Sequence, residues 1–426
     1  MLRLVCIALG IVCAGALVNA QTGAQLTDKA EQLIRAGDSA KALQTLTQAA
    51  QIPGNSAAVE DRIGFLLAVA GQSASALEHF AKAESLDAHF APAHYHMGAA
   101  LWLAKDYEHG LPELQTAVNL SPDSAEYRYR LGAAYLEKNE FEQAAKELKQ
   151  ATSLDASRAD IWTAYGSALR ESKNLTGALD ADAHALAINP ADDALRNSYA
   201  ILLIETRHPE QGIEEADKVL TGKTADAKNR NAAQMAIGYA NLKTGDFRKA
   251  EQAYEAVIAG DPLSPAAHYD LAIALKMQDK LDDAQKEFKE AVKEDPSLAQ
   301  AYYSLGIIQW QLGNFEEAIL QMRAAIASQP DYAEAHYMLG ITLKQNGDLD
   351  AAIPELKEAI RLDPTTPGPY NTLGQILRIK GDKQGSVEAF AMGAKLKQDK
   401  EREMANNLEQ GMRGGMAPQP IEGVKH

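Results

Sequence analysis

The chain has 426 residues, of which 46% are hydrophobic and 23% charged, and its formal net charge is −16. The hydrophobic fraction excludes wholesale disorder, and the acidic balance argues against nucleic acid or an anionic membrane surface as the main partner. Composition alone therefore predicts a folded, soluble protein and leaves its task open.

The first predicted element is a secretory signal peptide over residues 1–20. One positive charge precedes an apolar run over residues 4–18, which is shorter than the roughly 20 residues that cross a bilayer. Short side chains before Gln21 predict cleavage after Ala20, with an uncleaved anchor as the alternative. Both cysteines lie in this segment, so we expect an exported chain without disulfides, in a periplasm or outside the cell.

Residues 21–22 lead into a sequence that repeats with a period of 34 residues over residues 23–400. Eleven repeats begin at residues 23, 57, 91, 125, 159, 193, 231, 265, 299, 333 and 367, and the sixth is four residues longer than the others. The eighth and twentieth places of every repeat hold only glycine, alanine or, once, serine. Such small residues are needed where two helices approach closely, and larger apolar residues surround them at helical spacing. Each repeat is therefore predicted to contain two packed helices.

The ends of these helices are marked as well. Glycines end the first helix of several repeats, as a left-handed C-cap would, at Gly71, Gly245, Gly313, Gly347 and Gly381. Prolines follow the second helix, where a helix must stop, at Pro122, Pro190, Pro262, Pro296, Pro330 and Pro364. The predicted unit is a helix, a tight turn and a second helix.

This pattern closely resembles the tetratricopeptide repeat family, and the resemblance covers all but the signal peptide and the C-terminal tail. It implies an all-α fold, a right-handed superhelical α-solenoid of helix-turn-helix repeats that share one continuous core. The family resemblance also implies that the first helix of each repeat lines a concave side, where binding normally takes place.

Three places depart from the pattern. Residues 221–230 contain the four extra residues of the sixth repeat and could offset or hinge two parts of the superhelix. Asp182 stands in the fifth repeat where the second helix usually brings an aromatic residue or leucine toward its neighbour. After residue 400 the period lapses, which predicts a capping helix extension over residues 401–410 and a flexible tail over residues 411–426.

Gly222, Lys223 and Thr224 match the end of a phosphate-binding loop. Asp217, however, stands where that motif requires its first glycine, so a loop extension is the better interpretation. No Ser/His/Asp or Cys/His grouping stands outside the repeats, which leave no room for a second domain. We therefore predict a non-enzymatic protein without a cofactor.

Histidines gather once in the sequence, at His89, His94 and His96. His94 occupies the same buried fourth place of its repeat as His268 and His336, so the repeat itself explains it. Residues two apart on a helix point in different directions, which prevents His94 and His96 from sharing a metal. No metal site is predicted.

The remaining candidate is the concave face, where tyrosines recur at the fifth place of the first helix. Aromatic side chains there could hold a peptide, or they could pack between neighbouring repeats, as is ordinary for the family. Basic residues in the second half suggest an acidic partner or a C-terminal carboxylate, with a solvated face as the alternative. The predicted partner-binding residues are Tyr95, Trp102, Tyr129, Tyr239, Lys243, Tyr269, Lys276, Tyr303, Trp310, Tyr337, Lys344 and Arg378.

The sequence thus predicts a protein-interaction scaffold exported to the cell envelope, which binds a partner protein or peptide in its groove. The family's carboxylate-clamp variety has Lys and Asn at places that here hold Tyr and Ile or Ala, so recognition of that kind is not implied. The alternative function is a glycan-binding accessory protein in envelope polysaccharide assembly or export, because aromatic side chains also stack on sugars. The sequence does not identify the partner.

Overall fold

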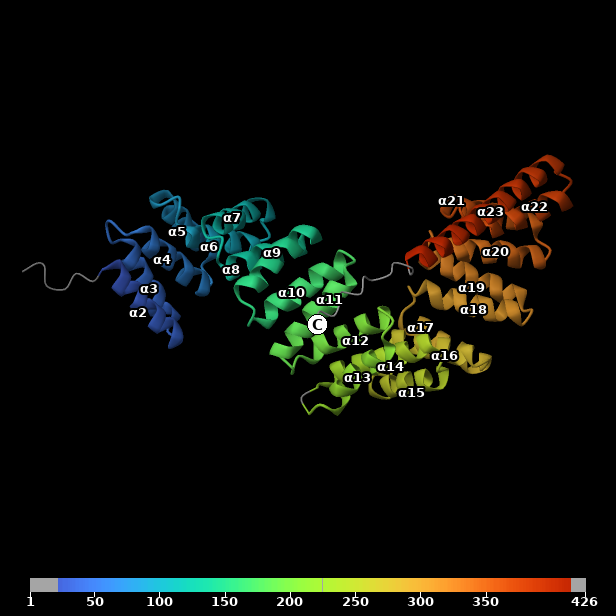
Figure 1. The fold of residues 1–426 in the computed structure, drawn as a ribbon, viewed down its shortest axis with the longest axis horizontal. Helices are drawn as coiled ribbons and strands as arrows, with labels where there is room; N and C mark the ends of the chain where they lie inside the picture. Colours follow the sequence, from blue (N-terminus) through green and yellow to red (C-terminus); the bar gives the residue numbers. More distant parts are fainter. Residues whose placement is uncertain (1–21, 224, 415–426) are drawn as a thin grey trace, which may run out of the picture. The chain divides into compact units, whose positions relative to one another are not determined.

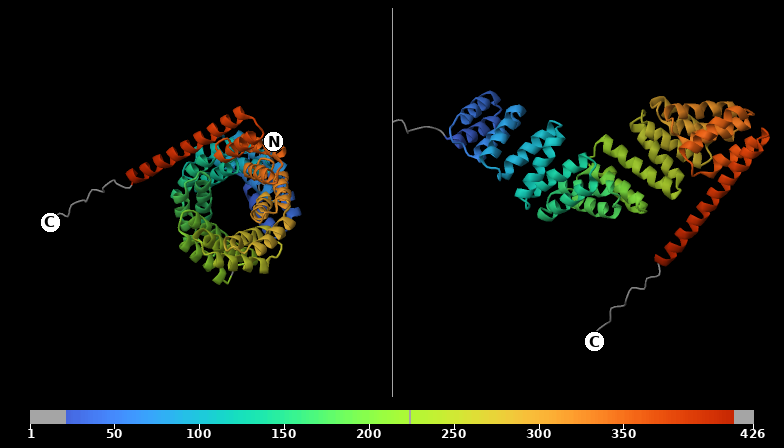
Figure 2. Two further views of the ribbon diagram at one scale, coloured as in Figure 1. Left: turned by 90° about the vertical axis from the view of Figure 1, so that its right-hand side faces the viewer. Right: turned by 90° about the horizontal axis from the view of Figure 1, so that it is seen from above.

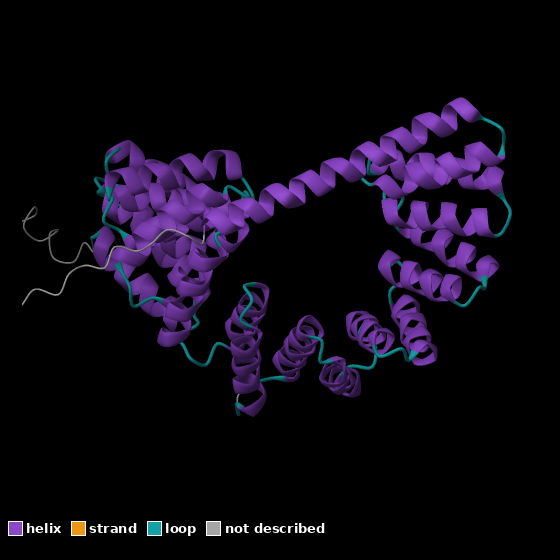
Figure 3. Cartoon of the chain, turned by 45° about the vertical axis from the view of Figure 1, so that its right-hand side comes forward, coloured by secondary structure: helices purple, strands orange, loops and turns teal. Residues whose placement is uncertain are grey.

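The computed structural model describes residues 22–223 and 225–414, in which every regular element is an α-helix and short loops join the helices (Figure 3). Within this part, 22 helices follow one another as eleven consecutive pairs (Figure 1). The expected α-solenoid of helix pairs is confirmed. The predicted signal peptide over residues 1–20 and most of the predicted tail, from residue 415 onward, lie outside the described residues.

The helix pairs keep the period of the sequence. The first helices are α2 (Gly23–Arg35), α4 (Ala57–Val69), α6 (Ala91–Leu103), α8 (Ala125–Glu137), α10 (Ala159–Glu171), α12 (Asp193–Glu205), α14 (Ala227–Thr244), α16 (Pro265–Met277), α18 (Ala299–Gln311), α20 (Ala333–Gln345) and α22 (Pro367–Ile379). The second helices are α3 (Ser39–Ala50), α5 (Ser73–Leu86), α7 (Tyr107–Leu120), α9 (Phe141–Leu154), α11 (Leu175–Ile188), α13 (Pro209–Thr221), α15 (Phe247–Gly260), α17 (Leu281–Glu294), α19 (Phe315–Ser328), α21 (Leu349–Leu362) and α23 (Lys383–Gly414). Apart from α14, each first helix begins where the period places the first residue of its repeat.

The four extra residues of the sixth repeat lie in a helix rather than in a longer loop. Helix α14 begins at Ala227 and has 18 residues, whereas α12 and α16 have 13 each. The Asp226 side chain caps the added turn by accepting a hydrogen bond from the Asn229 backbone N–H. Arg230 donates to the carbonyl oxygens of Leu220 and Gly222, which holds the preceding turn against the helix.

The chain divides into two compact blocks, and the boundary lies between Thr206 and Arg207. We call them the N-terminal block and the C-terminal block. The sixth repeat is divided by this boundary, because α12 belongs to the N-terminal block and α13 to the C-terminal block. Within each block, a first helix packs on the second helix of its own pair, and neighbouring first helices such as α4 and α6, or α20 and α22, also contact each other. The first helices therefore share one side of each block, which we call the first-helix face.

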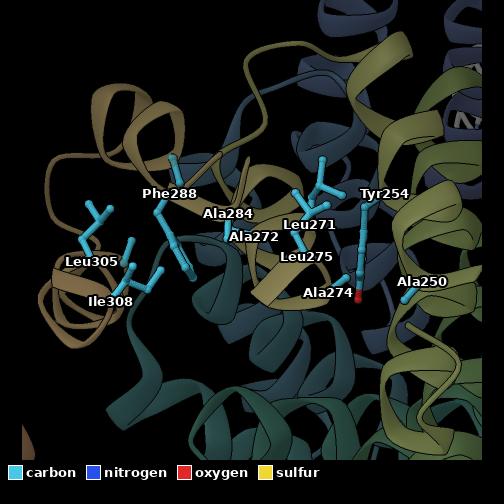
Figure 4. Packing of buried hydrophobic residues seen from close by; sticks show 12 residues of the cluster. Ala250, Tyr254, Leu271, Ala272, Ala274, Leu275, Ala284, Phe288, Leu305 and Ile308 are labelled. Atoms are coloured by element: carbon cyan, nitrogen blue, oxygen red, sulfur yellow. The ribbon is translucent and has the colours of Figure 1, made fainter. Parts of the chain in front are cut away.

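Large apolar side chains from successive helices form the core. In the C-terminal block, Tyr254 of α15 and Phe288 of α17 are fully buried and pack with residues of α16 and α18 (Figure 4). The small residues at the eighth place make room for these side chains. A Cβ atom on Gly238 would lie 2.5 Å from Cε1 of Tyr254, and one on Gly132 would lie 2.5 Å from Cγ of Leu148. The predicted close approach at this place is confirmed.

The fifteenth place of every repeat has a left-handed backbone. Six repeats place glycine there, at Gly37, Gly71, Gly245, Gly313, Gly347 and Gly381, with φ between 79° and 90°. The other five place a residue with a side chain there, at Lys105, Asn139, Lys173, Arg207 and Asp279, with φ between 59° and 69°. The predicted glycine caps are confirmed, and the same turn forms where the sequence has no glycine.

The last helix, α23, has 32 residues and runs on past the end of α22 (Figure 2). It continues to Gly414, beyond residue 410 where we expected the capping extension to end. Every side chain from Lys397 to Asn406 is exposed, and most of them are polar. No helix of the described residues combines the length and the apolar character that crossing a membrane requires.

Candidate functional site

The first-helix face of the N-terminal block contains a cavity of about 350 Å³, which we call the first-helix pocket. Its walls come from α4, α5, α6 and α8. The lining residues are Phe65, Ala68, Ser73, Phe80, Tyr95, His96, Ala99, Ala100, Leu103, Ala104 and Arg130. Small residues of α6 leave the space open, and aromatic residues and a leucine make its surface largely apolar.

The histidine of the pocket is held from two sides. His96 Nδ1 lies 2.7 Å from Oδ1 of Asp61, a residue that is itself buried. The imidazole ring stacks on Phe80 with the centroids 5.6 Å apart, and it also contacts Phe65 at 5.3 Å. His96 is therefore a fixed part of the wall, and it is not directed toward His94.

Tyr95 forms another wall and joins two repeats. Its hydroxyl donates to Oε1 of Glu126 at 2.7 Å, and its ring stacks on Tyr127 with the centroids 4.6 Å apart. Burial, reinforced by the Glu126 carboxylate, raises the pKa of Tyr95 to about 12, so the phenol is neutral in any physiological medium. Tyr95 thus offers a ring edge and a hydroxyl rather than a charge.

Two side chains of the pocket are distinguished by their exposure and charge. Leu103 has 84% of its surface exposed at the rim, which is unusual for a leucine in the described part of this chain. Arg130 forms no ion pair with any described carboxylate, and its Nε is shielded from solvent without a hydrogen-bond acceptor, while its guanidinium interacts with the Tyr95 side chain. A guanidinium without a carboxylate partner, beside an apolar surface, suits a carboxylate carried by an apolar group.

The other two predicted residues of the N-terminal block are engaged in packing. Trp102 is 8% exposed, donates its indole N–H to Glu137 and packs on Tyr107 with the ring centroids 4.6 Å apart. It is a core residue, so its ring is not available on the surface. Tyr129 lies under the guanidinium of Arg158, 5.0 Å from its ring centroid.

The predicted tyrosines of the C-terminal block are partly buried between neighbouring helices. Tyr269 packs on Phe288, with the centroids 5.6 Å apart, and Tyr303 packs on Tyr332 at 5.2 Å. The hydroxyl of Tyr337 approaches Gly368 so closely that a Cβ atom there would lie 2.5 Å from it. Tyr239 lies 5.3 Å below the ammonium group of Lys243. These tyrosines therefore serve packing within repeats and, for Tyr337, packing against the next repeat.

Basic residues of the C-terminal block occupy the last turn of four first helices, and we call them the basic stripe: Lys243, Lys276, Lys344 and Arg378. A helix C-terminus itself favours a cation, which is a structural reason for part of this pattern. Lys344 donates to Gln375, and Arg378 lies 5.9 Å from the Phe390 ring centroid. No ion pair of Lys276 is found among the described residues. Trp310, between Lys276 and Lys344, is half-buried and donates its indole N–H to Gln345.

The structure adds Phe65, Leu103 and Arg130 to the candidate residues, none of which the sequence analysis proposed. The signal that could have found them is Ala99, at the ninth place of the third repeat. Three repeats of the second half place isoleucine there, at Ile273, Ile307 and Ile341. A small residue in place of a large one leaves a space, and the aromatic residues of the preceding repeat then line it.

Comparisons with known proteins agree with the helix-pair architecture. Models described as "Tetratricopeptide repeat" match residues 101–167 and, in overlapping segments, residues 235–299, 273–324 and 303–367. A search of the curated proteins gave no match.

Solved structures that resemble the chain include MamA, with 29% identity over 39% of this chain and 97% of that one, at a TM-score of 0.37. A tetratricopeptide repeat protein from Parabacteroides merdae is 16% identical over 59% of this chain and 98% of its own, at a TM-score of 0.49. Yeast Tom70 is 14% identical over 94% of this chain and 97% of its own, at a TM-score of 0.48.

Proposed function

Because the chain is a tetratricopeptide repeat protein, we propose that it is a non-enzymatic scaffold. It would bind a partner protein or peptide on its first-helix face. Such repeats commonly present an extended surface to a protein partner rather than a reactive centre. The proposal names a binding region for this chain, the first-helix pocket of the N-terminal block.

The observation that carries the proposal is the exposed Leu103 in that pocket beside Arg130, which has no carboxylate partner among the described residues. An apolar side chain of the partner would bury its surface against Phe65 and Leu103, for a gain of roughly 1.5–3 kcal/mol. A carboxylate on the same segment would reach the guanidinium of Arg130 in a charge-assisted hydrogen bond. The pocket therefore favours a peptide that combines an apolar residue with an acidic residue or a C-terminus.

The basic stripe supports the same preference in the C-terminal block. Lys243 and Arg378 are exposed, and both would attract acidic segments of a partner. In a chain with a net charge of −16, basic residues at the ends of four first helices provide a local surface of opposite sign. We therefore propose an acidic protein or peptide as the partner.

The glycan alternative has less support. Trp102 lies in the core, and Trp162 stacks face to face on His184, with the centroids 4.4 Å apart. Sugar binding needs flat aromatic faces that are open to solvent. Trp102 offers none, His184 covers one face of Trp162, and Trp310 is half-buried. A glycan ligand remains as an outcome of the experiment below.

The experiment is a capture assay with residues 21–426 as bait, first on envelope extract and then with the purified captured protein. Leu103→Asp and Arg130→Gln should each lower the affinity at least tenfold, with an unchanged far-UV circular dichroism spectrum. Leu320→Asp is the matched control, because Leu320 is 59% exposed on the second helix α19. Equal capture by all three variants would refute the pocket as the binding region, and binding of an oligosaccharide alone would refute a protein partner.

Export to the cell envelope is also proposed, on the basis of the signal peptide predicted over residues 1–20. The measurement is the intact mass and N-terminal sequence of the protein recovered from its native compartment. A chain that begins at Gln21 supports export with cleavage after Ala20. A full-length chain recovered from the cytoplasm would refute this proposal.

A further inference from the structure

Three repeats share a histidine that joins their two helices. Its Nδ1 contacts a glutamate nineteen residues later, and its Nε2 contacts a backbone carbonyl six residues earlier. The Nδ1 distances are 2.7 Å for His94 with Glu113, 2.6 Å for His268 with Glu287 and 2.7 Å for His336 with Glu355. The Nε2 distances to the oxygens of Ala88, Pro262 and Pro330 are 3.1, 3.0 and 3.1 Å. The second contact orients each ring, so that Nδ1 always faces the glutamate.

One of these three places carries an additional carboxylate. Ten residues before the histidine, two repeats have an isoleucine that packs in the core, Ile258 and Ile326. The corresponding residue before His94 is Glu84, whose Oε1 lies 3.5 Å from the same Nδ1 that contacts Glu113. This oxygen is shielded from solvent and accepts no hydrogen bond. Burial and the neighbouring Glu113 raise the pKa of Glu84, and the nearby His94 imidazole opposes this rise.

The three groups have the distances and the surroundings of a metal site. One ligand atom each from Glu84 on α5, His94 on α6 and Glu113 on α7 lies within 4.8 Å of the other two. Zinc holds nitrogen and oxygen ligands at about 2.0–2.2 Å, which separates tetrahedral ligands by roughly 3.3–3.6 Å. The contact of His94 with Glu84 already fits this spacing, and the contact with Glu113 needs to open by less than about 1 Å.

The surroundings of His94 also match those of a metal ligand. Histidines that bind metals usually donate their other ring N–H to a carboxylate or a backbone carbonyl, as Nε2 of His94 can to Ala88. Two carboxylates and a neutral imidazole would balance the charge of a dication. The side chains are 12–29% exposed, so a water molecule could reach the remaining coordination position.

We propose that Glu84, His94 and Glu113 bind a divalent cation of the zinc class, which joins the second and third repeats by linking α5, α6 and α7. The mixed nitrogen and oxygen donors favour zinc over calcium and magnesium, which prefer oxygen ligands alone. This site is separate from the first-helix pocket and does not depend on the proposed partner.

The experiment is isothermal titration of untagged residues 21–426 with zinc chloride in a buffer that does not bind metals. The wild-type chain should bind one equivalent, and Glu84→Ile should weaken that binding at least 100-fold. Isoleucine is the residue that the other two repeats have at this place, so this variant should keep its fold and its unfolding temperature without zinc. His268→Gln is the control, because its site lacks the third ligand, and binding should be unchanged. Absence of saturable binding to the wild-type chain, or equal binding to Glu84→Ile, would overturn the proposal.

A gain-of-binding variant tests the same idea in the opposite direction. Ile326→Glu places the third carboxylate beside His336 and Glu355, whose mutual contact of 2.7 Å equals that of His94 and Glu113. This variant should bind two equivalents of zinc. A stoichiometry that stays at one would contradict the conclusion that the glutamate ten residues before the histidine creates the site.

Discussion

Arg170 and Asp182 form an ion pair inside the fifth repeat, with Nη2 of the arginine 2.6 Å from Oδ2 of the aspartate. The Asp182 side chain is 1% exposed, and its other oxygen accepts no hydrogen bond. A Cβ atom on Gly166 would lie 2.2 Å from that oxygen, so the carboxyl group fills the space that a large apolar side chain fills in other repeats. Burial raises the pKa of Asp182 to about 6, although Arg170 opposes the rise.

This raised pKa predicts how stability depends on pH. The unfolded chain releases the Asp182 proton near pH 4, whereas the folded chain keeps it until about pH 6. The contribution of Asp182 to the free energy of unfolding is therefore greatest below pH 4, falls as the pH rises to about 6 and is constant above that. The decrease is about 3 kcal/mol for a shift of two pKa units.

Asp182→Asn isolates this contribution, because asparagine resembles the protonated aspartic acid at every pH. Urea unfolding followed by circular dichroism should give the two proteins similar stabilities near pH 4. At pH 7 the variant should be the more stable, by up to about 3 kcal/mol. A difference that does not change with pH would show that Asp182 titrates alike in the folded and unfolded chains.

Replacing the buried carboxylate by an apolar side chain should also stabilise the N-terminal block. In Asp182→Leu, the leucine would lie against Gly166 as Leu114 lies against Gly98. Arg170 has a side chain that is 32% exposed and can turn to water, so the expected gain at pH 7 is about 1–3 kcal/mol. The measurement is the urea midpoint of the variant against the wild-type chain.

Arg170→Ala is the opposite test of the same pair. Removing the cation leaves Asp182 buried without compensation, so this variant should be less stable than wild type at pH 7 and closer to it at pH 4. If Asp182→Leu were instead destabilising at pH 7, the ion pair would contribute more than the apolar packing that replaces it.

The helix pairs could be predicted from the sequence because the signal is repeated. Gly132 at the eighth place and Ala144 at the twentieth recur as small residues in eleven repeats, and only close helix packing requires them there. The left-handed turns at Gly245 and Gly313 were predicted on the same ground. A period averages over many residues, so it is informative about the features that all repeats share.

The candidate site could be predicted only in part, because it depends on what single repeats do differently. Trp102 is of a residue type that often binds partners, yet its contacts with Tyr107 and Glu137 make it part of the core. In the sequence, Arg130 cannot be told apart from other surface cations. Only the structure shows that no described carboxylate pairs with it. Such properties depend on three-dimensional neighbours from other repeats, which the period does not specify.

The close contact between Gly238 and Tyr254 gives a third prediction. Alanine is favoured over glycine in a helix by about 1 kcal/mol, but a Cβ at residue 238 would lie 2.5 Å from the Tyr254 ring. Tyr254 is fully buried and packs within the core cluster of the C-terminal block. Gly238→Ala should therefore lower the free energy of unfolding by about 1–3 kcal/mol.

Gly260→Ala is the control for this prediction, because Gly260 is exposed at the end of α15 and its Cβ would approach only the Asn231 side chain, at 3.2 Å. Its stability should stay within about 1 kcal/mol of wild type. If Gly238→Ala proved as stable as this control, the prediction would be contradicted. Helices α14 and α15 could then move apart enough to accept the added methyl group without a loss of stability.

The left-handed turns give the last prediction, which concerns the backbone alone. Lys173 has a φ of 65°, a conformation that costs a residue with a side chain about 1–2 kcal/mol. Glycine avoids this cost but loses more conformational freedom on folding, so Lys173→Gly should stabilise the chain by about 0.5–1 kcal/mol. Lys173→Ala should give no such gain, because alanine keeps the Cβ atom that opposes the conformation.

The reverse change, Gly347→Ala, should destabilise the chain although a Cβ there would have no atom within 4 Å. Thermal unfolding of the three variants distinguishes backbone strain from packing. An equal gain in stability from Lys173→Gly and Lys173→Ala would contradict the prediction. It would mean that the gain comes from removal of the lysine side chain and not from relief of the left-handed strain.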